Sequence, residues 1–180
     1  VFDLFIRVDS NTNGHCLWYS FKVRSSAKQT ATFTICNLKS SKTLYNEGQM
    51  NPYFYSNLSS KWQQLPCSSG TLRPLKYLFL RSKYPKNKCT HFTLTFEYGF
   101  EADEEVHFSY CIPYTYSQLL KTISEVRQIA NLHNTQLSIS NFCESLSGLE
   151  IPLLTFGSGK QCVLISARTH PGESNGSWVV

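Results

Sequence analysis

The sequence of 180 residues predicts an N-terminal antiparallel β-sandwich over residues 1–112, followed by the beginning of an α/β domain over residues 113–180. Three observations support this fold class. Apolar and polar residues alternate in the first part, a helical period follows Pro113, and a continuous apolar run lies near the end. Alternation places one face of a strand on a core and the other toward solvent, as in antiparallel sheets.

The alternation is clearest in four segments, and turn-forming residues separate them. The segments are residues 17–23, 32–35, 92–98 and 106–110. Residues 9–14, 24–26 and 101–105 have the composition of turns. Residues 56–60 and 67–70 are expected to be loops. The basic stretch 73–88 is interpreted as a solvated loop flanking a strand, with attraction to acidic partners as the alternative.

A helix and two strands are predicted after Pro113. One stripe of residues at steps of three and four predicts a helix over 115–133: Tyr116, Leu119, Ile123, Val126, Ala130 and His133. His133 is expected to pack or to cap the helix end rather than to bind a ligand. Residues 140–147 are expected to form a polar connection, 149–156 a strand and 157–160 a tight turn. Residues 162–167 are expected to form a central strand buried on both faces.

Composition and charge exclude several classes of protein. The net charge of +5 is low for a dedicated nucleic-acid binder, and no apolar run is long enough to cross a membrane. No signal peptide is visible, and the first residue is Val1, so an internal fragment of a longer protein is expected. Seven cysteines without a C-x-x-C pair predict reduced structural thiols in a cytosolic protein, several of them buried, such as Cys36 and Cys162.

The candidate chemistry lies where the run 162–167 ends. His170 precedes Pro171-Gly172, a turn sequence, and Glu173 follows it. Open α/β sheets place their sites beyond the carboxyl ends of strands, and zinc accepts both imidazole nitrogen and carboxylate oxygen. The two ligating atoms are therefore expected within about 3–4 Å of each other. The other reading is a surface loop in which Glu173 only favours a helix N-terminus.

Residues 163–178, which read VLISARTHPGESNGSW, resemble the zinc-binding segment of the cytosolic carboxypeptidases. These belong to the M14 metallocarboxypeptidases, in the branch that trims glutamates from tubulin. The resemblance extends to residues 113–117 and 143–148, and in the β region to 37–39, 41–45 and 48–52. Gln49 departs from the family pattern, in which Gly and Met are adjacent.

The resemblance implies that His170 and Glu173 are the first two zinc ligands. The third ligand, a histidine, and the arginine and glutamate that bind and activate the substrate and water would lie after Val180. The fragment alone is therefore expected to be inactive, and Arg168 to be structural. The resemblance implies tubulin or another glutamate-rich protein tail as partner, with no nucleic acid and no membrane. It implies a cytosolic location, with microtubules, cilia or basal bodies as candidate sites.

Three alternatives stay open at this point. The β domain is a non-catalytic module that binds acidic tails through residues 73–88, if the downstream ligands are missing. A nucleic-acid binder would need exposed aromatics among its basic residues, whereas the aromatics here alternate as core residues. A zinc deacylase acting on N-acyl amino acids shares His-x-x-Glu, but the upstream β domain argues against it.

Overall fold

The structure is a computed structural model that describes residues 1–12, 14–39, 50–65, 78–81 and 92–180, with the backbone alone for 78–81. The chain forms two compact units. The first comprises Val1–Pro113 together with His170–Ser174, and the second comprises Tyr114–Thr169 together with Asn175–Val180. The domain boundary at residues 112/113 stays a prediction. The basic stretch 73–88 lies outside the described residues, apart from the backbone of Leu78–Arg81.

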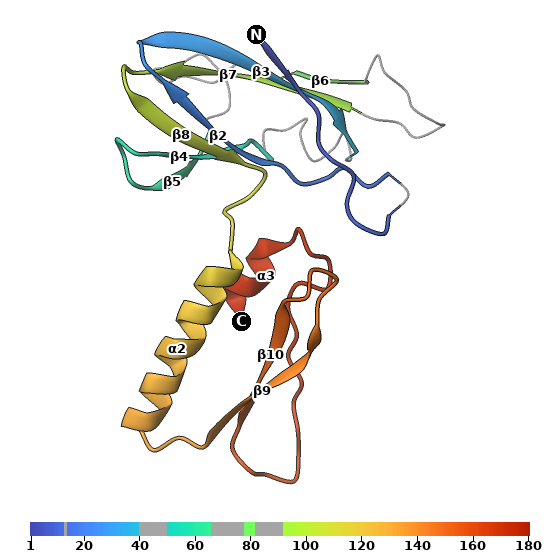
Figure 1. Ribbon diagram of the computed structural model, residues 1–180, viewed down its shortest axis with the longest axis vertical. Helices are drawn as coiled ribbons and strands as arrows, with labels where there is room; N and C mark the ends of the chain where they lie inside the picture. Colours follow the sequence, from blue (N-terminus) through green and yellow to red (C-terminus); the bar gives the residue numbers. More distant parts are fainter. Residues whose placement is uncertain (13, 40–49, 66–77, 82–91) are drawn as a thin grey trace. The chain divides into compact units, whose positions relative to one another are not determined.

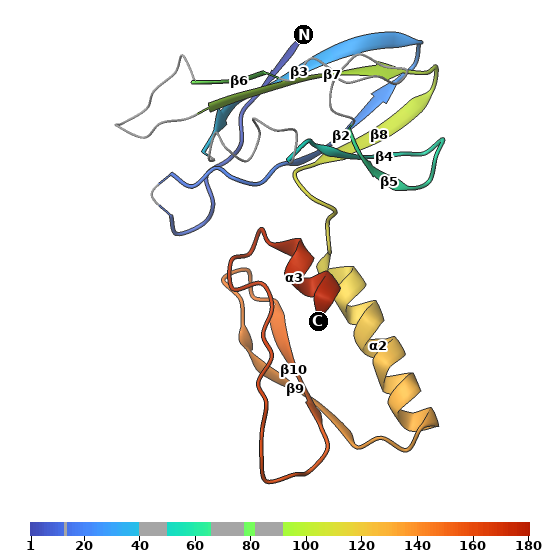
Figure 2. The same cartoon turned by 180° about the vertical axis from the view of Figure 1, so that it is seen from behind.

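The first unit is a sandwich of two four-stranded sheets, which Figures 1 and 2 show as two layers. One sheet has the order β1 (Phe2–Leu4), β3 (Gln29–Leu38), β7 (Phe92–Phe100), β6 (Leu78–Arg81). The other has the order β2 (Ser20–Ser25), β8 (Glu104–Ser109), β4 (Tyr53–Ser56), β5 (Trp62–Gln64). The four predicted strands are confirmed as β2, β3, β7 and β8. β1, β4, β5 and β6 were not predicted, because three or four residues are too few to show a period.

Alternating residues of both sheets form the core. Phe33 of β3, Phe96 of β7 and Phe108 of β8 are almost completely buried, and their ring centroids lie 5.3–5.5 Å apart. Tilted aromatic pairs at these distances stabilise a core beyond their area of burial. The period of two therefore identified the inward face of the sandwich correctly.

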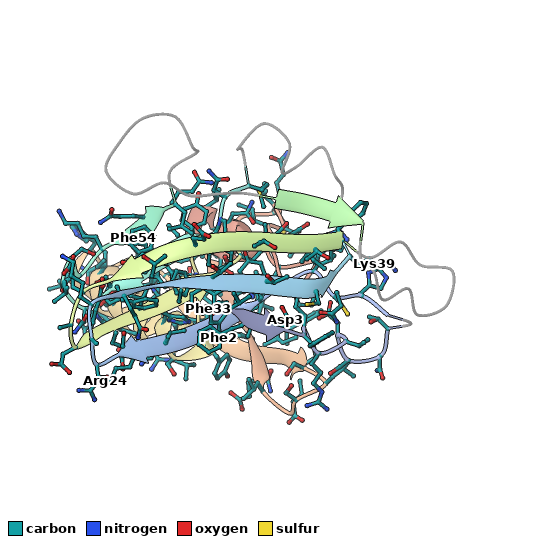
Figure 3. The ribbon with its side chains drawn as sticks, turned by 90° about the horizontal axis from the view of Figure 1, so that it is seen from above. Phe2, Asp3, Arg24, Phe33, Lys39 and Phe54 are labelled. Carbon is teal, nitrogen blue, oxygen red and sulfur yellow. The ribbon has the colours of Figure 1, made fainter. Side chains whose placement is uncertain are left out.

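The expectation that all strands are antiparallel is wrong at one edge. β1 pairs with β3 in parallel, with Phe2 opposite Phe33, and the two rings stack at 5.6 Å (Figure 3). Beyond β1, the side-chain amide of Asn37 exchanges two hydrogen bonds with the backbone of Ile6, at 2.7 and 2.8 Å. Residue periodicity reports which face of a strand is buried, not the direction of its neighbour, so it could not predict this pair.

A buried carboxylate joins the two sheets at the turn between β7 and β8. Oε1 of Glu104 accepts hydrogen bonds from Ser56 Oγ at 2.6 Å and from the Tyr98 hydroxyl at 2.9 Å. Oε2 accepts from the backbone N–H of Glu101 at 2.8 Å. Asp103 adopts a left-handed backbone conformation (φ 56°), which the short turn requires. The predicted turn is therefore confined to residues 101–103, and Glu104 and Glu105 begin β8, with Glu104 buried in the interior.

In the second unit, α2 (Tyr116–Leu132) confirms the predicted helix. Thr115 caps its start by accepting the Gln118 N–H, and His133 occupies the C-cap position, as expected. Asn134 follows in a left-handed conformation (φ 52°), and the Thr135 N–H donates to the Ala130 carbonyl at 2.8 Å. This is the hydrogen-bond pattern of a Schellman motif, with asparagine where glycine is most common.

Two expectations for the second unit are wrong. Residues 140–147 are not a polar connection, because β9 (Leu137–Glu144) pairs there with β10 (Glu150–Phe156) in an antiparallel hairpin. Residues 162–167 form no strand, and Val163, Leu164 and Ile165 are 84%, 82% and 69% exposed. A strand requires a hydrogen-bonding neighbour, and no described strand pairs with this run. α3 (Ser174–Val179) follows it.

None of the five described cysteines forms a disulfide. Cys16 and Cys36 are buried and Cys111 is half-buried. Burial raises the pKa of the Cys16 and Cys36 thiols, with Asp9 and Asp3 adding to the respective shifts. Cys143 and Cys162 are exposed, so the expected burial of Cys162 is wrong for the same reason as the strand that was to contain it.

Candidate metal site

The candidate ligands His170 and Glu173 are brought together by a tight turn. The Glu173 N–H donates to the His170 carbonyl at 3.0 Å, which closes a four-residue turn through Pro171-Gly172. The side chains at its two ends converge: His170 Nδ1 and Glu173 Oε1 lie 2.9 Å apart. Two ligands of one zinc ion are expected about 3–4 Å apart, so the two atoms lie marginally closer than expected.

Both side chains of this pair are accessible to solvent. The His170 side chain is 78% exposed and that of Glu173 57%. An imidazole nitrogen beside a carboxylate oxygen is a donor set that zinc accepts, so the residues present fit the metal. Within the described residues no third histidine, cysteine or acid joins them. The role of His170 and Glu173 as ligands stays a prediction.

The turn lies against the sandwich through contacts that sequence reasoning missed. The Trp18 indole N–H donates to Cys111 Sγ at 3.3 Å, and Cys111 Sγ lies 3.7 Å from the Gly172 carbonyl and 3.1 Å from Ser174 Oγ. Ser174, which is 2% exposed, donates to the Ile112 carbonyl at 2.5 Å. Both Trp18 and Cys111 are half-buried, and no spacing or motif distinguishes them from other residues of the β region, so the sequence contained no signal for them.

The turn also affects the pKa of a neighbouring side chain, the phenol of Tyr110. Burial raises the pKa of Tyr110, and Cys111 and Glu173 add to that shift. Proximity of a carboxylate favours the neutral phenol, so Tyr110 remains a hydrogen-bonding group rather than an anion at neutral pH.

Arg168 has the structural contacts expected of it. Its guanidinium donates to the Tyr114 carbonyl at 3.3 Å and to Ser177 Oγ at 3.5 Å, and its backbone is left-handed (φ 62°). Trp178 packs edge-on against Tyr114 at 5.0 Å. Arg168 therefore links the residues after the run 162–167 to the segment that enters α2.

Residues 1–110 match the sequence profile described as the cytosolic carboxypeptidase N-terminal domain. The chain belongs to the cytosolic carboxypeptidase family. Cytosolic carboxypeptidase 2 from Xenopus tropicalis is 33% identical over 196 residues, which cover 99% of this chain and 19% of the relative. Cytosolic carboxypeptidase 6 from Caenorhabditis elegans is 31% identical over 184 residues, covering 99% of this chain and 38% of the relative.

The fold of this cytosolic carboxypeptidase segment also has a solved counterpart. The crystal structure of a metallo-carboxypeptidase from Burkholderia cenocepacia aligns with a TM-score of 0.63 at 17% identity, covering 98% of this chain and 40% of that one. The family and the fold class predicted from the sequence are thus confirmed. The chain spans less than two fifths of the length of the curated relatives named here. No described helix is long and apolar enough to cross a membrane.

Proposed function

We propose that the chain is part of a zinc metallocarboxypeptidase that removes glutamates from acidic protein tails such as those of tubulin, in the cytosol. The observation that supports this proposal is the convergence of His170 Nδ1 and Glu173 Oε1 at 2.9 Å across the Pro-Gly turn. Membership of the cytosolic carboxypeptidase family supports the reaction class. An association with microtubules, cilia or basal bodies belongs to the same proposal.

The two side chains have separate tasks in this proposal. His170 provides an imidazole nitrogen and Glu173 a carboxylate oxygen, and the turn between them fixes their separation. Zinc, when bound, supplies positive charge that polarises the scissile carbonyl and lowers the pKa of a bound water toward 7. The third ligand, the arginine for the substrate carboxylate and the general-base glutamate are proposed to lie after Val180. These 180 residues alone are accordingly proposed to be inactive.

The test is zinc content and glutamate release by the full-length protein that contains this chain. His170→Ala and Glu173→Ala are each expected to lower zinc content and to abolish release of glutamate from a peptide with an acidic C-terminal tail. His133→Ala is the matched control, because His133 is an exposed histidine at the end of α2. Full zinc content and normal turnover in both ligand variants would contradict the proposal.

The non-catalytic module that binds acidic tails through residues 73–88 is the competing function. Those residues lie outside the part of the chain whose side chains are described, so no observed contact favours it. The same experiment separates the two functions. Tail binding that survives both ligand variants, without any glutamate release by the parent protein, would support the module.

A further inference from the structure

A chain of hydrogen bonds connects the sandwich to the turn that bears His170 and Glu173. Its direction follows from counting protons. Ser174 has a single hydroxyl proton, which it donates to the Ile112 carbonyl, so at Cys111 the serine oxygen is the acceptor. The single thiol proton is therefore directed at Ser174 Oγ, at 3.1 Å, with the Gly172 carbonyl as a second, more distant acceptor at 3.7 Å, while the sulfur accepts the Trp18 indole N–H.

We propose that Cys111 is a positioning residue: together with Trp18 and Ser174 it holds the turn His170–Glu173 on the β-sandwich, so that the two donor side chains converge. The expected effect of Cys111 on zinc affinity rests on the proposed function, whereas its effect on the conformation of the turn does not. Cys111 contacts neither His170 nor Glu173 by hydrogen bond, and acts on them through Gly172 and Ser174, which flank Glu173.

Packing at the same point supports the hydrogen bonds. Gly172 lies against the indole ring of Trp18, so closely that a methyl group at Gly172 would be 3.4–3.7 Å from three atoms of that side chain. Ser174 is buried while Glu173, the residue before it, is exposed. The turn thus has an inner side attached to the sandwich and an outer side that presents both donors to solvent.

Three variants of the 180-residue chain separate positioning from general stability. Cys111→Ala removes the acceptor of the Trp18 N–H and the donor to Ser174 Oγ, which keeps its bond to the Ile112 carbonyl. Cys111→Ser keeps one donor and one acceptor at the same place. Cys36→Ala is the matched control, because Cys36 is a buried cysteine of the same sandwich whose thiol donates within its own strand to the Thr34 carbonyl.

The first measurement is amide hydrogen exchange of residues 170–174 without metal. Cys111→Ala is expected to speed exchange at Glu173, whose N–H closes the turn, while Cys111→Ser and Cys36→Ala leave it close to the parent rate. Unchanged exchange in Cys111→Ala, or equal acceleration in Cys36→Ala, would overturn the proposal.

The second measurement is Zn²⁺ affinity, by competition with a chromophoric chelator. Cys143 and Cys162 are exposed, and a thiolate is a zinc ligand, so the relevant site is defined as the binding that His170→Ala and Glu173→Gln remove. Cys111→Ala is expected to weaken that binding about 10-fold, at the lower end of the 10–100-fold that groups bonded directly to metal ligands contribute, because Cys111 acts only through Gly172 and Ser174. Cys111→Ser is expected to restore most of it. Equal affinity in Cys111→Ala and the parent would also overturn the proposal.

The two measurements distinguish the two hypotheses. If the full-length protein binds no zinc that depends on His170 and Glu173, the proposed function fails. In that case the amide hydrogen exchange of residues 170–174 still shows whether Cys111 holds the turn in place.

Discussion

Glu104 shows how a single residue can connect two sheets. Its carboxylate is 2% exposed and accepts hydrogen bonds from Ser56, Tyr98 and the Glu101 backbone. Hydrogen bonds to a charged group contribute more than those between neutral groups, and donors left unsatisfied in the interior are costly. Glu104 is therefore a main determinant of the corner at which the chain passes from β7 to β8.

Glu104→Ala is expected to lower the free energy of unfolding by about 1.5–3 kcal/mol, because three donors lose their acceptor. The measurement is a urea unfolding curve followed by aromatic fluorescence. Glu105→Ala is the control on the adjacent residue: its exposed ion pair with Lys22 at 3.0 Å is expected to contribute less than about 1 kcal/mol. Equal losses in both variants would contradict a special role for the buried carboxylate.

His107, on the outer face of the second sheet, predicts a pH dependence of stability. Ser20 Oγ lies 2.6 Å from its Nε2, and the Trp62 ring packs at 5.3 Å. Burial lowers the pKa of His107 below its ordinary value of about 6.5, Lys22 adds to the shift, and Glu105 opposes it. The unfolded chain therefore takes up this proton at higher pH than the folded chain.

The stabilising contribution of neutral His107 is thus complete above about pH 6.5 and is lost as pH falls from there toward the lower pKa of the folded state. His107→Gln is expected to show a smaller drop in urea midpoint between pH 7.5 and pH 5.5 than the parent. Carboxylates titrate in both proteins, so the difference between the two slopes isolates the histidine. Equal slopes of urea midpoint against pH in His107→Gln and the parent would contradict the role given to His107.

For single residues, the sequence predicted which side chains lie close together better than it predicted which side chains are buried. The proximity of His170 and Glu173 was predicted from the Pro-Gly turn between them, whereas their assignment as zinc ligands rested on the resemblance to the cytosolic carboxypeptidases. The burial of Glu104 was not predicted, because an acid in a run with three other acids looks solvent-exposed, and its burial depends on Ser56, which is 48 residues away. Contacts of that kind leave no local pattern.

The elements differ in how well their patterns predicted them. α2 matches its predicted range closely, since its cap residues and its apolar stripe are both local signals. Residues 162–167 have the composition of a buried strand, but that composition reports only a preference, and a strand exists when a neighbour pairs with it. The parallel pair of β1 and β3 was missed because direction is a property of two strands together.

Thr115 is expected to determine the stability of the first turn of α2. Thr115→Ala removes the acceptor for the Gln118 N–H, at 3.2 Å, and is expected to cost about 1 kcal/mol of helix stability. Thr115→Ser keeps a hydroxyl in place and is expected to remain close to the parent. Thermal unfolding followed by circular dichroism at 222 nm measures both, and a loss of equal size in the serine variant would argue against the cap.

For the whole molecule, the main consequence concerns apolar surface. The second unit leaves large side chains exposed, including the consecutive Val163, Leu164 and Ile165. Contiguous exposed apolar residues mark interaction sites or promote association. The first unit, in contrast, buries the aromatic rings that its alternation predicted.

The 180-residue chain is therefore expected to bind an apolar fluorescent dye such as ANS under native conditions. Replacing Val163 and Leu164 by serine is expected to reduce the fluorescence of the bound dye, and to reduce self-association in sedimentation velocity. Lys160→Ser, at an exposed polar position of the same segment, is the control. Undiminished dye binding by the double variant would show that this run is not the exposed surface responsible.

The pairing of β2 with β8 affects how the protein is made as well as how it is held together. Ser20 and His107, which contact each other across these strands, are 87 residues apart in the chain. During synthesis β2 therefore emerges long before its partner exists, and the same holds for β3 and β7. Sandwiches built from such distant pairs fold in about milliseconds to seconds, slower than helical domains of similar size. Phe21 of β2 and Phe33 of β3 therefore cannot be buried in the sandwich core until residues 92–109 have been synthesised.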